Sequence, residues 1–297
     1  MFAVLATTGL IAFATGRRTV RKGATPSALR SAPEITHEPT EGYYDARRGA
    51  AGYAPIVGAF GALAVPAVVV VFVNLTDAQR HSPAAAFAAG LLVVTVIASI
   101  IGAISLAAIG GESSLTPNLT SAVMFAAVPV VIALVDVVAA FELLSSLALP
   151  DARLLLQLIT GASGALGVFF TALALGDSWA THPAHSPNYE EWKEDEWIRS
   201  QEEADKAALW VAGLGVLPVT IGTALRVFAG LRVTASVTTA NSIILCGLAL
   251  SVAATVASAL RTHHPERVPS RGPRPEEAYV TTLATSTYAA ILLIFLP

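Results

Sequence analysis

Long apolar runs separated by polar stretches dominate the chain. A helix that crosses about 30 Å of hydrocarbon needs about 20 apolar residues, because each residue adds roughly 1.5 Å. Eight stretches approach or meet that length, and they lie at residues 2–15, 54–73, 84–109, 119–140, 154–175, 207–227, 235–260 and 280–296. The pattern predicts an all-α polytopic membrane protein with about eight transmembrane helices, embedded in a lipid bilayer.

The composition narrows the class further. Of the 297 residues, 54% are hydrophobic and 13% are charged, which is about half of the roughly 25% charge of soluble domains. That deficit excludes a disordered chain and an ordinary cytosolic enzyme. The net charge is −3, and no basic stripe with interleaved aromatic residues is present, so nucleic acid is not an expected partner.

The distribution of basic residues predicts the orientation. The first apolar run is short, and its basic cluster follows it, so we interpret residues 2–15 as an uncleaved anchor with the N-terminus outside. A removed signal segment that ends near Ala14 is the alternative. With the anchor in place, 14 of the 18 Lys and Arg residues fall in the predicted cytoplasmic loops, as the positive-inside rule requires. Both termini are therefore expected outside the cell's inner or plasma membrane.

The spans also arrange as two sets of four, residues 1–153 and 154–297. Each half has one span, a long cytoplasmic loop and then three spans, and the loops are basic at 16–53 and acidic at 176–206. Gly61–Pro66 matches Gly213–Pro218 at an offset of 152. The hypothesis is two parallel four-helix repeats about an axis along the membrane normal. Chance alignment of Ala, Gly, Val and Leu is the alternative.

Asp136 is the most informative single residue. It follows Val131-Ile-Ala-Leu-Val, and it lies roughly 22 Å along a helix that begins near Ser121. An isolated carboxylate at such depth costs at least about 3 kcal/mol, so it must be protonated, paired or turned toward a wet cavity. The residue is a candidate for binding or relaying a cation, and a structural hydrogen bond or ion pair is the alternative.

Several neighbours bear on that carboxyl group. Arg226, near the outer end of the sixth span, is a possible charge partner of Asp136. Glu142 lies 240° around the helix from Asp136, so it is expected as a solvated charge at the outer interface, within reach of Arg153. Pro129, two turns before Asp136, is expected to open the backbone and to offer carbonyl ligands.

A strongly acidic segment occupies residues 188–206. It contains eight acidic residues against three basic ones, interrupted by aromatic residues at roughly helical spacing. Because anionic lipid attracts basic segments, this helix is not expected on the headgroups. It is a candidate dock for a cytoplasmic or membrane protein partner, with Glu190, Trp192, Glu194 and Trp197 as the docking residues. A solvated helix pinned to the interface by its tryptophans is the alternative.

No catalytic motif is present. The chain has no phosphate loop, no GxSxG elbow and no HExxH helix, and its histidines lack the spacing of a zinc site. We therefore predict no catalytic residue, no metal and no cofactor. The expected function is a membrane transport component, either a small ion-coupled transporter or an ion-conducting subunit of a larger complex. A non-catalytic structural or docking subunit is the first alternative, and an intramembrane lipid or isoprenoid enzyme is a weaker one.

Overall fold

The computed structural model describes residues 46–112, 119–148, 194–228, 236–263 and 275–295. Every regular element in these ranges is an α-helix. Five helical segments are long and apolar enough to cross a membrane: Ala46–Pro66, Pro83–Gly110, Leu119–Leu147, Val237–Thr262 and Glu276–Phe295. The all-α class is thus confirmed for the described residues, and five helical segments there have the length and apolar character that the predicted spans require. The predicted spans 2–15 and 154–175 lie outside the described residues, so the count of eight stays a prediction.

The helix bounds agree with most of the predicted spans. The described elements are α2 (Ala46–Asn74), α3 (Asp77–Arg80), α4 (Pro83–Gly110), α5 (Leu119–Ala148), α7 (Glu194–Val227), α8 (Val237–His263) and α9 (Pro275–Phe295). Helix α7 differs from the other long helices in its apolar length, because its apolar part covers only Leu209–Gly222. That stretch is shorter than the predicted span 207–227, and the helix continues backward through the second half of the acidic segment.

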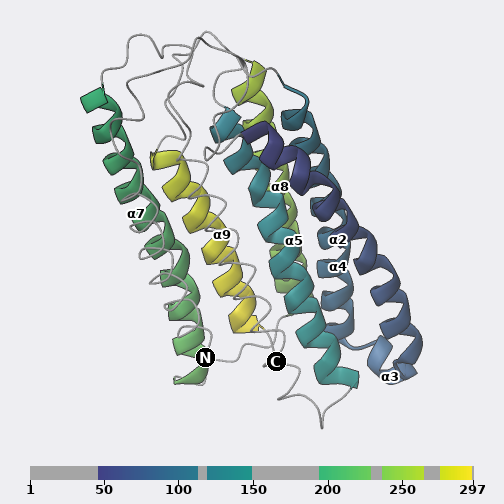
Figure 1. Cartoon of the computed structure of the whole chain (residues 1–297). Helices are drawn as coiled ribbons and strands as arrows, with labels where there is room; N and C mark the ends of the chain where they lie inside the picture. The colour runs from purple at the N-terminus through teal and green to yellow at the C-terminus, as the bar shows by residue number, and fades with distance from the viewer. Residues whose placement is uncertain (1–45, 113–118, 149–193, 229–235, 264–274, 296–297) are drawn as a thin grey trace.

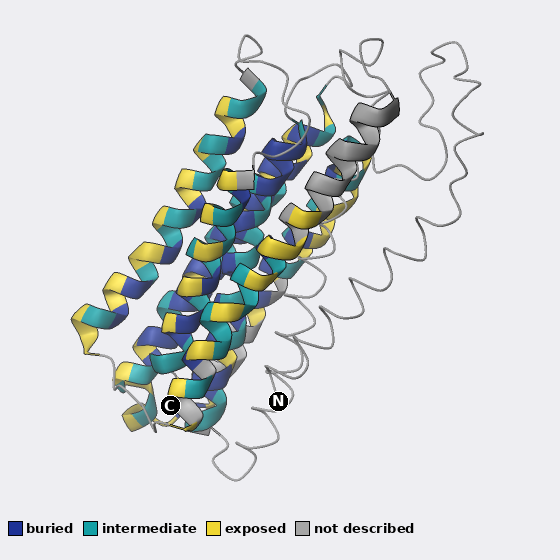
Figure 2. Ribbon diagram, turned by 90° about the vertical axis from the view of Figure 1, so that its left-hand side faces the viewer, coloured by how far each residue is buried: buried dark blue, intermediate teal, exposed yellow. Residues whose placement is uncertain are grey.

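Helix α5 lies at the centre of the bundle. It packs against α4 and α8 and also touches α2 and α9, whereas α7 packs against α9 at the edge of the bundle (Figure 1). Buried residues gather on the ribbons in the middle of the bundle, and exposed residues lie along the outer helices (Figure 2). Because lipid is as apolar as the exposed leucines and valines, the outward apolar faces suit a bilayer. Polar side chains in the centre of the bundle are therefore the candidates for a functional site.

The start of α2 corrects one expectation. Residues 16–53 were expected to form a cytoplasmic loop, but residues 46–53 form the first two turns of α2. Ala46 and Ala50 are buried in a cluster with Leu106, Ile109 and Ala122 of α4 and α5. Packing of these small residues extends the helix, a tertiary effect that local composition does not reveal.

Helices α2 and α4 approach closely at Gly61. A Cβ atom placed on Gly61 would lie 2.6 Å from the Cβ of Ser99 on α4, which is closer than two carbons can pack. Small residues let membrane helices pack closely, and Gly61 allows this approach between α2 and α4.

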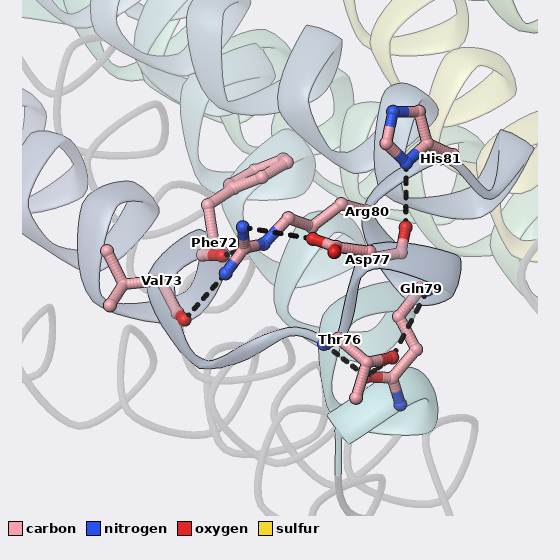
Figure 3. A network of polar contacts seen from close by, with 7 residues as sticks. All are labelled: Phe72, Val73, Thr76, Asp77, Gln79, Arg80 and His81. Atoms are coloured by element: carbon pink, nitrogen blue, oxygen red, sulfur yellow. Dashed lines mark hydrogen bonds and ion pairs between the residues drawn. The ribbon is translucent and has the colours of Figure 1, made fainter.

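A short polar structure joins α2 to α4 at one end of the bundle (Figure 3). Thr76 and Gln79 form a capping box at the start of α3. The Arg80 guanidinium donates to the carbonyls of Phe72, at 2.9 Å, and Val73, at 3.0 Å. These carbonyls end α2 without partners of their own, so α3 serves as a cap for the preceding span.

The proposed duplication is not confirmed by the packing. Adding 152 to the bounds of α4 gives 235–262, which agrees with α8 at Val237–His263. The neighbours, however, do not repeat: α4 packs mainly against α2 and α5, while α8 packs mainly against α5 and α4. Element lengths follow the offset in the described part, but the arrangement of helices does not, so the two repeats remain a hypothesis.

Candidate functional site

Asp136 lies in the centre of the bundle and is fully buried, with 0% relative exposure. It lies on α5, the helix that most of the other described helices surround. Neighbouring positions such as Ile132, Val137 and Ala140 belong to the main apolar cluster, together with Leu91 and Leu92 of α4. A polar side chain in such surroundings loses its hydration and needs protein partners in exchange.

One partner is Tyr288 on α9. Its hydroxyl donates a hydrogen bond of 2.7 Å to Oδ1 of Asp136, and the tyrosine is itself 2% exposed. The predicted charge partner of Asp136 was Arg226, whose side chain lies outside the described part, and the contact that the structure describes is with this hydroxyl. Sequence reasoning missed Tyr288 because the two residues are 152 positions apart. That separation equals the offset of the proposed duplication, the one signal that points to the pair.

The second carboxyl oxygen of Asp136 has no partner among the residues that the structure describes. Its Oδ2 atom is buried and takes part in no hydrogen bond with them. Whichever protonation state the carboxyl has, the described protein groups leave this oxygen unsatisfied. An unsatisfied buried polar atom costs about 1–3 kcal/mol, and such atoms in native proteins call for a functional or solvent explanation.

Helix α8 makes room for the tyrosine at Gly247. A Cβ atom on this glycine would lie 2.5 Å from the Tyr288 hydroxyl oxygen and 2.8 Å from its Cζ. Ser251, one turn further along α8, is buried and donates to the Gly247 carbonyl at 2.9 Å. The absence of a side chain at position 247 therefore permits the hydroxyl to sit where it reaches Asp136.

A further polar contact lies one turn from Asp136. The buried Thr95 hydroxyl of α4 donates to Leu91 of its own helix at 3.0 Å and to the Ala133 carbonyl of α5 at 3.4 Å. Ala133 precedes Asp136 by three residues, so this contact fixes α4 against the turn of α5 that carries the carboxyl group. The site thus draws on α4, α5, α8 and α9.

Pro129 does not supply ligands to this site. Helix α5 continues from Leu119 to Ala148 with the proline inside it. The carbonyl that a helical proline leaves free belongs to the residue four positions earlier, here Phe125. This carbonyl is eleven residues from Asp136, or roughly 16 Å along the helix. The expectation of extra carbonyl ligands beside Asp136 is therefore wrong on grounds of distance.

Glu142 also departs from its expected place. It was expected as a solvated charge, but it is buried at 6% relative exposure. The reason is the central position of α5, which is covered on several sides and not along one stripe. A 240° separation from Asp136 therefore does not bring Glu142 to the surface.

The remaining candidates cannot be placed by their side chains. Arg226, Glu194 and Trp197 belong to α7, and their side chains are outside the described part, while Arg153, Glu190 and Trp192 lie outside the described residues altogether. Their roles as charge partners or docking residues stay predictions.

A second polar cluster joins three helix ends. Arg261 at the end of α8 forms an ion pair with Glu277 at the start of α9. Ser121 near the start of α5 donates to Glu277 at 3.4 Å, and Ser258 donates to the Ala122 carbonyl at 2.9 Å. These contacts fix α5, α8 and α9 together at the end of the bundle opposite α3, and sequence reasoning did not identify them.

Among the described residues, no three His, Cys, Asp or Glu side chains converge as a metal site. No protein-family model, curated protein or solved structure matches the chain. The geometry of Asp136 and its neighbours is therefore the best guide to function.

Proposed function

We propose that the protein is a membrane-embedded ion-transport component, in which Asp136 binds or relays the ion. It is either a small ion-coupled transporter or an ion-conducting subunit of a larger complex. The observation that carries the proposal is Oδ2 of Asp136, which is buried and has no hydrogen-bond partner among the described residues, in the centre of a bundle whose helices are long and apolar enough to cross a membrane. Ionisable residues at membrane depth mark ion or proton routes as a rule.

The surroundings of the carboxyl group support this role. Tyr288 anchors Oδ1 and leaves Oδ2 available, so the carboxyl has one fixed and one free oxygen. A purely structural carboxyl is expected to use both oxygens, because each unsatisfied one is destabilising. The half-satisfied arrangement favours an ion site over a fastener between α5 and α9.

The orientation is part of the proposal. We place both termini outside the cell's inner or plasma membrane, with α3 at the outer end and the Arg261–Glu277 pair at the cytoplasmic end. The acidic segment 188–206 then faces the cytoplasm, where it is proposed as the dock for a protein partner.

The test compares purified wild-type protein with Asp136→Asn in proteoliposomes. Entrapped pH-sensitive and Na⁺-sensitive dyes report the decay of imposed gradients. Because asparagine keeps the shape but cannot carry a charge or a proton, the flux is expected to fall about tenfold or more. Glu142→Gln, a neutralised acid on the same helix, is the matched control and is expected to retain the flux. Unchanged flux in Asp136→Asn refutes the proposal.

A structural role makes a different prediction. Replacing both partners of a buried polar pair with apolar residues is often neutral for stability. If Asp136→Asn fails to fold, the double variant Asp136→Leu/Tyr288→Phe is purified instead, and its assembly is followed by size-exclusion chromatography. A folded double variant that has lost its flux supports the ion site. One that keeps full flux assigns Asp136 to structure alone.

A further inference from the structure

We infer that the ion handled at Asp136 is a proton and not a metal cation. The inference depends on the proposed function and specifies its ion. It follows from three features of the site: the number of oxygen atoms near Oδ2, the continuity of the helices around it, and the identity of the ionisable residues on those helices.

The first feature is the shortage of ligands. Calcium and magnesium ions bound in proteins take about six or more oxygen ligands, and potassium channels strip the hydration shell with rings of carbonyls. The described polar atoms at Asp136 are its own carboxylate oxygens and the Tyr288 hydroxyl. The hydrogen bonds described for the Thr95 hydroxyl go to the Leu91 and Ala133 carbonyls and not to Asp136. A proton needs only one oxygen, and Oδ2 has no hydrogen-bond partner among the described residues.

The second feature is the unbroken backbone. Transporters that bind Na⁺ use unwound helix segments, whose carbonyls coordinate the ion. Helices α4, α5, α8 and α9 each run without interruption past the level of Asp136. Their carbonyls accept helical hydrogen bonds there, and the carbonyl freed by Pro129 is roughly 16 Å away. The backbone therefore adds no cation ligands to the site.

The third feature is the set of ionisable residues on the helices around the site. Helix α4 contains none, and α8 contains Cys246, Arg261 and His263. Helix α9 contains Glu276, Glu277, Tyr279 and Tyr288, and α5 adds Glu142. Of these, Tyr288 contacts the carboxyl, while Arg261 and Glu277 pair at the end of the bundle. No described second carboxylate joins Asp136 to neutralise a metal cation.

The loading step is then simple to write. A proton binds at Oδ2 and converts the carboxylate into the neutral acid, while Oδ1 keeps the hydrogen bond from Tyr288. Release of the same proton from Oδ2 restores the carboxylate. Tyr288 acts as a positioning residue, because it holds the carboxyl by the other oxygen and exchanges no proton itself.

The test uses dicyclohexylcarbodiimide, a lipid-soluble reagent that adds to carboxylic acids in apolar surroundings. The acid O–H adds across a C=N bond, and the adduct rearranges to a stable N-acylurea without a leaving group. Full-length protein in proteoliposomes is treated with the reagent at a series of pH values. Each treatment is done with and without about 100 mM Na⁺ or K⁺, a concentration close to physiological salt. Peptide mass spectrometry quantifies the label on Asp136, with Glu142→Gln as the background that removes the other acid of α5.

A proton site predicts labelling that falls about tenfold per pH unit above its midpoint and is unaffected by either salt. Protection by Na⁺ or K⁺ at constant pH overturns the inference and leaves the proposed function intact. Absence of labelling at every pH shows a sealed carboxyl and overturns both. Tyr288→Phe tells whether Tyr288 positions the carboxyl group or only stabilises the fold. Loss of its hydrogen bond to Asp136 is expected to move the midpoint of the labelling profile along the pH axis, whereas a loss of stability alone would lower only the yield of folded protein.

Discussion

At the scale of single residues, the centre of the molecule depends on the fit of three residues from three helices. Asp136 accepts from Tyr288, and Tyr288 occupies space that Gly247 leaves open. Because the hydroxyl lies so near the α8 backbone, the geometry at position 247 controls the contact between α5 and α9. A change on one helix is therefore expected to alter a hydrogen bond between two others.

Gly247→Ala tests that dependence. The new Cβ would meet the Tyr288 ring and hydroxyl, and such overpacking costs about 1–3 kcal/mol. We expect a lower free energy of unfolding in detergent and a loss of flux, because the hydroxyl is displaced from Asp136.

Gly213→Ala on α7 is the matched control. A Cβ at this position has no atom within 4 Å, and alanine is favoured over glycine in a helix by roughly 0.5–1 kcal/mol. The control is expected to be neutral or more stable. Equal stability of the two variants contradicts the close packing described at Gly247.

The sequence identified Asp136 as a candidate ion-binding residue but did not identify Tyr288 as its partner, for a physical reason. A charged residue in an apolar run is conspicuous because its burial is costly wherever its partner lies. A tyrosine near the middle of an apolar helix is ordinary, since its ring is apolar and its hydroxyl needs only one partner. Glu142 was misplaced because the sequence of one helix does not show on how many sides other helices cover it.

At the scale of elements, helix ends were predicted well where the sequence contains capping residues. Helix α4 is well predicted because Ser82 caps it and a proline occupies its first turn, as N-terminal preferences require. The start of α2 is poorly predicted because it depends on burial of alanines against other helices. The α3 turn was missed because its stability comes from caps and not from an apolar pattern.

Arg80→Ala tests the cap at the end of α2. The variant loses two hydrogen bonds to the last carbonyls of that helix, and each is worth about 0.5–1.5 kcal/mol when the carbonyl is shielded from water. Since the Arg80 side chain is 42% exposed, we expect a loss near the lower limit, about 1 kcal/mol in total, measured by denaturant unfolding in detergent.

Asp77→Asn is the companion variant. It removes the exposed ion pair with Arg80 while the carbonyl contacts stay in place. Exposed ion pairs contribute about 0.2–1 kcal/mol at most, so this variant is expected to be less destabilised than Arg80→Ala. If it is destabilised more, the ion pair rather than the carbonyl cap stabilises this end.

At the scale of the whole molecule, polar contacts join the bundle at three levels. One end is joined by α3, where Gln79 donates to the Leu147 carbonyl of α5 at 2.6 Å. The middle has the Asp136–Tyr288 contact, and the other end has the Arg261–Glu277 pair. Apolar packing alone does not fix the register between neighbouring helices in a membrane. These polar contacts therefore set how the helices are oriented relative to one another.

The orientation itself is testable with single thiols. In a Cys246→Ser background, we introduce Ala78→Cys in α3 or Gly111→Cys at the end of α4, both at exposed positions. The positive-inside argument predicts that a membrane-impermeant maleimide labels position 78 in intact cells and position 111 only after permeabilisation. The reverse pattern inverts the proposed topology and places the acidic segment outside.

The native thiol offers one more use of the site. Cys246 is exposed on the bundle surface and immediately precedes Gly247, the residue against which the Tyr288 hydroxyl lies. A trifluoromethyl tag on this sulfur is one residue from the glycine that the Tyr288 hydroxyl contacts, so it reports from the bundle surface on changes at the buried carboxyl. Fluorine resonance frequencies recorded across an acid–base titration would then follow protonation of Asp136 without any modification of Asp136 or Tyr288.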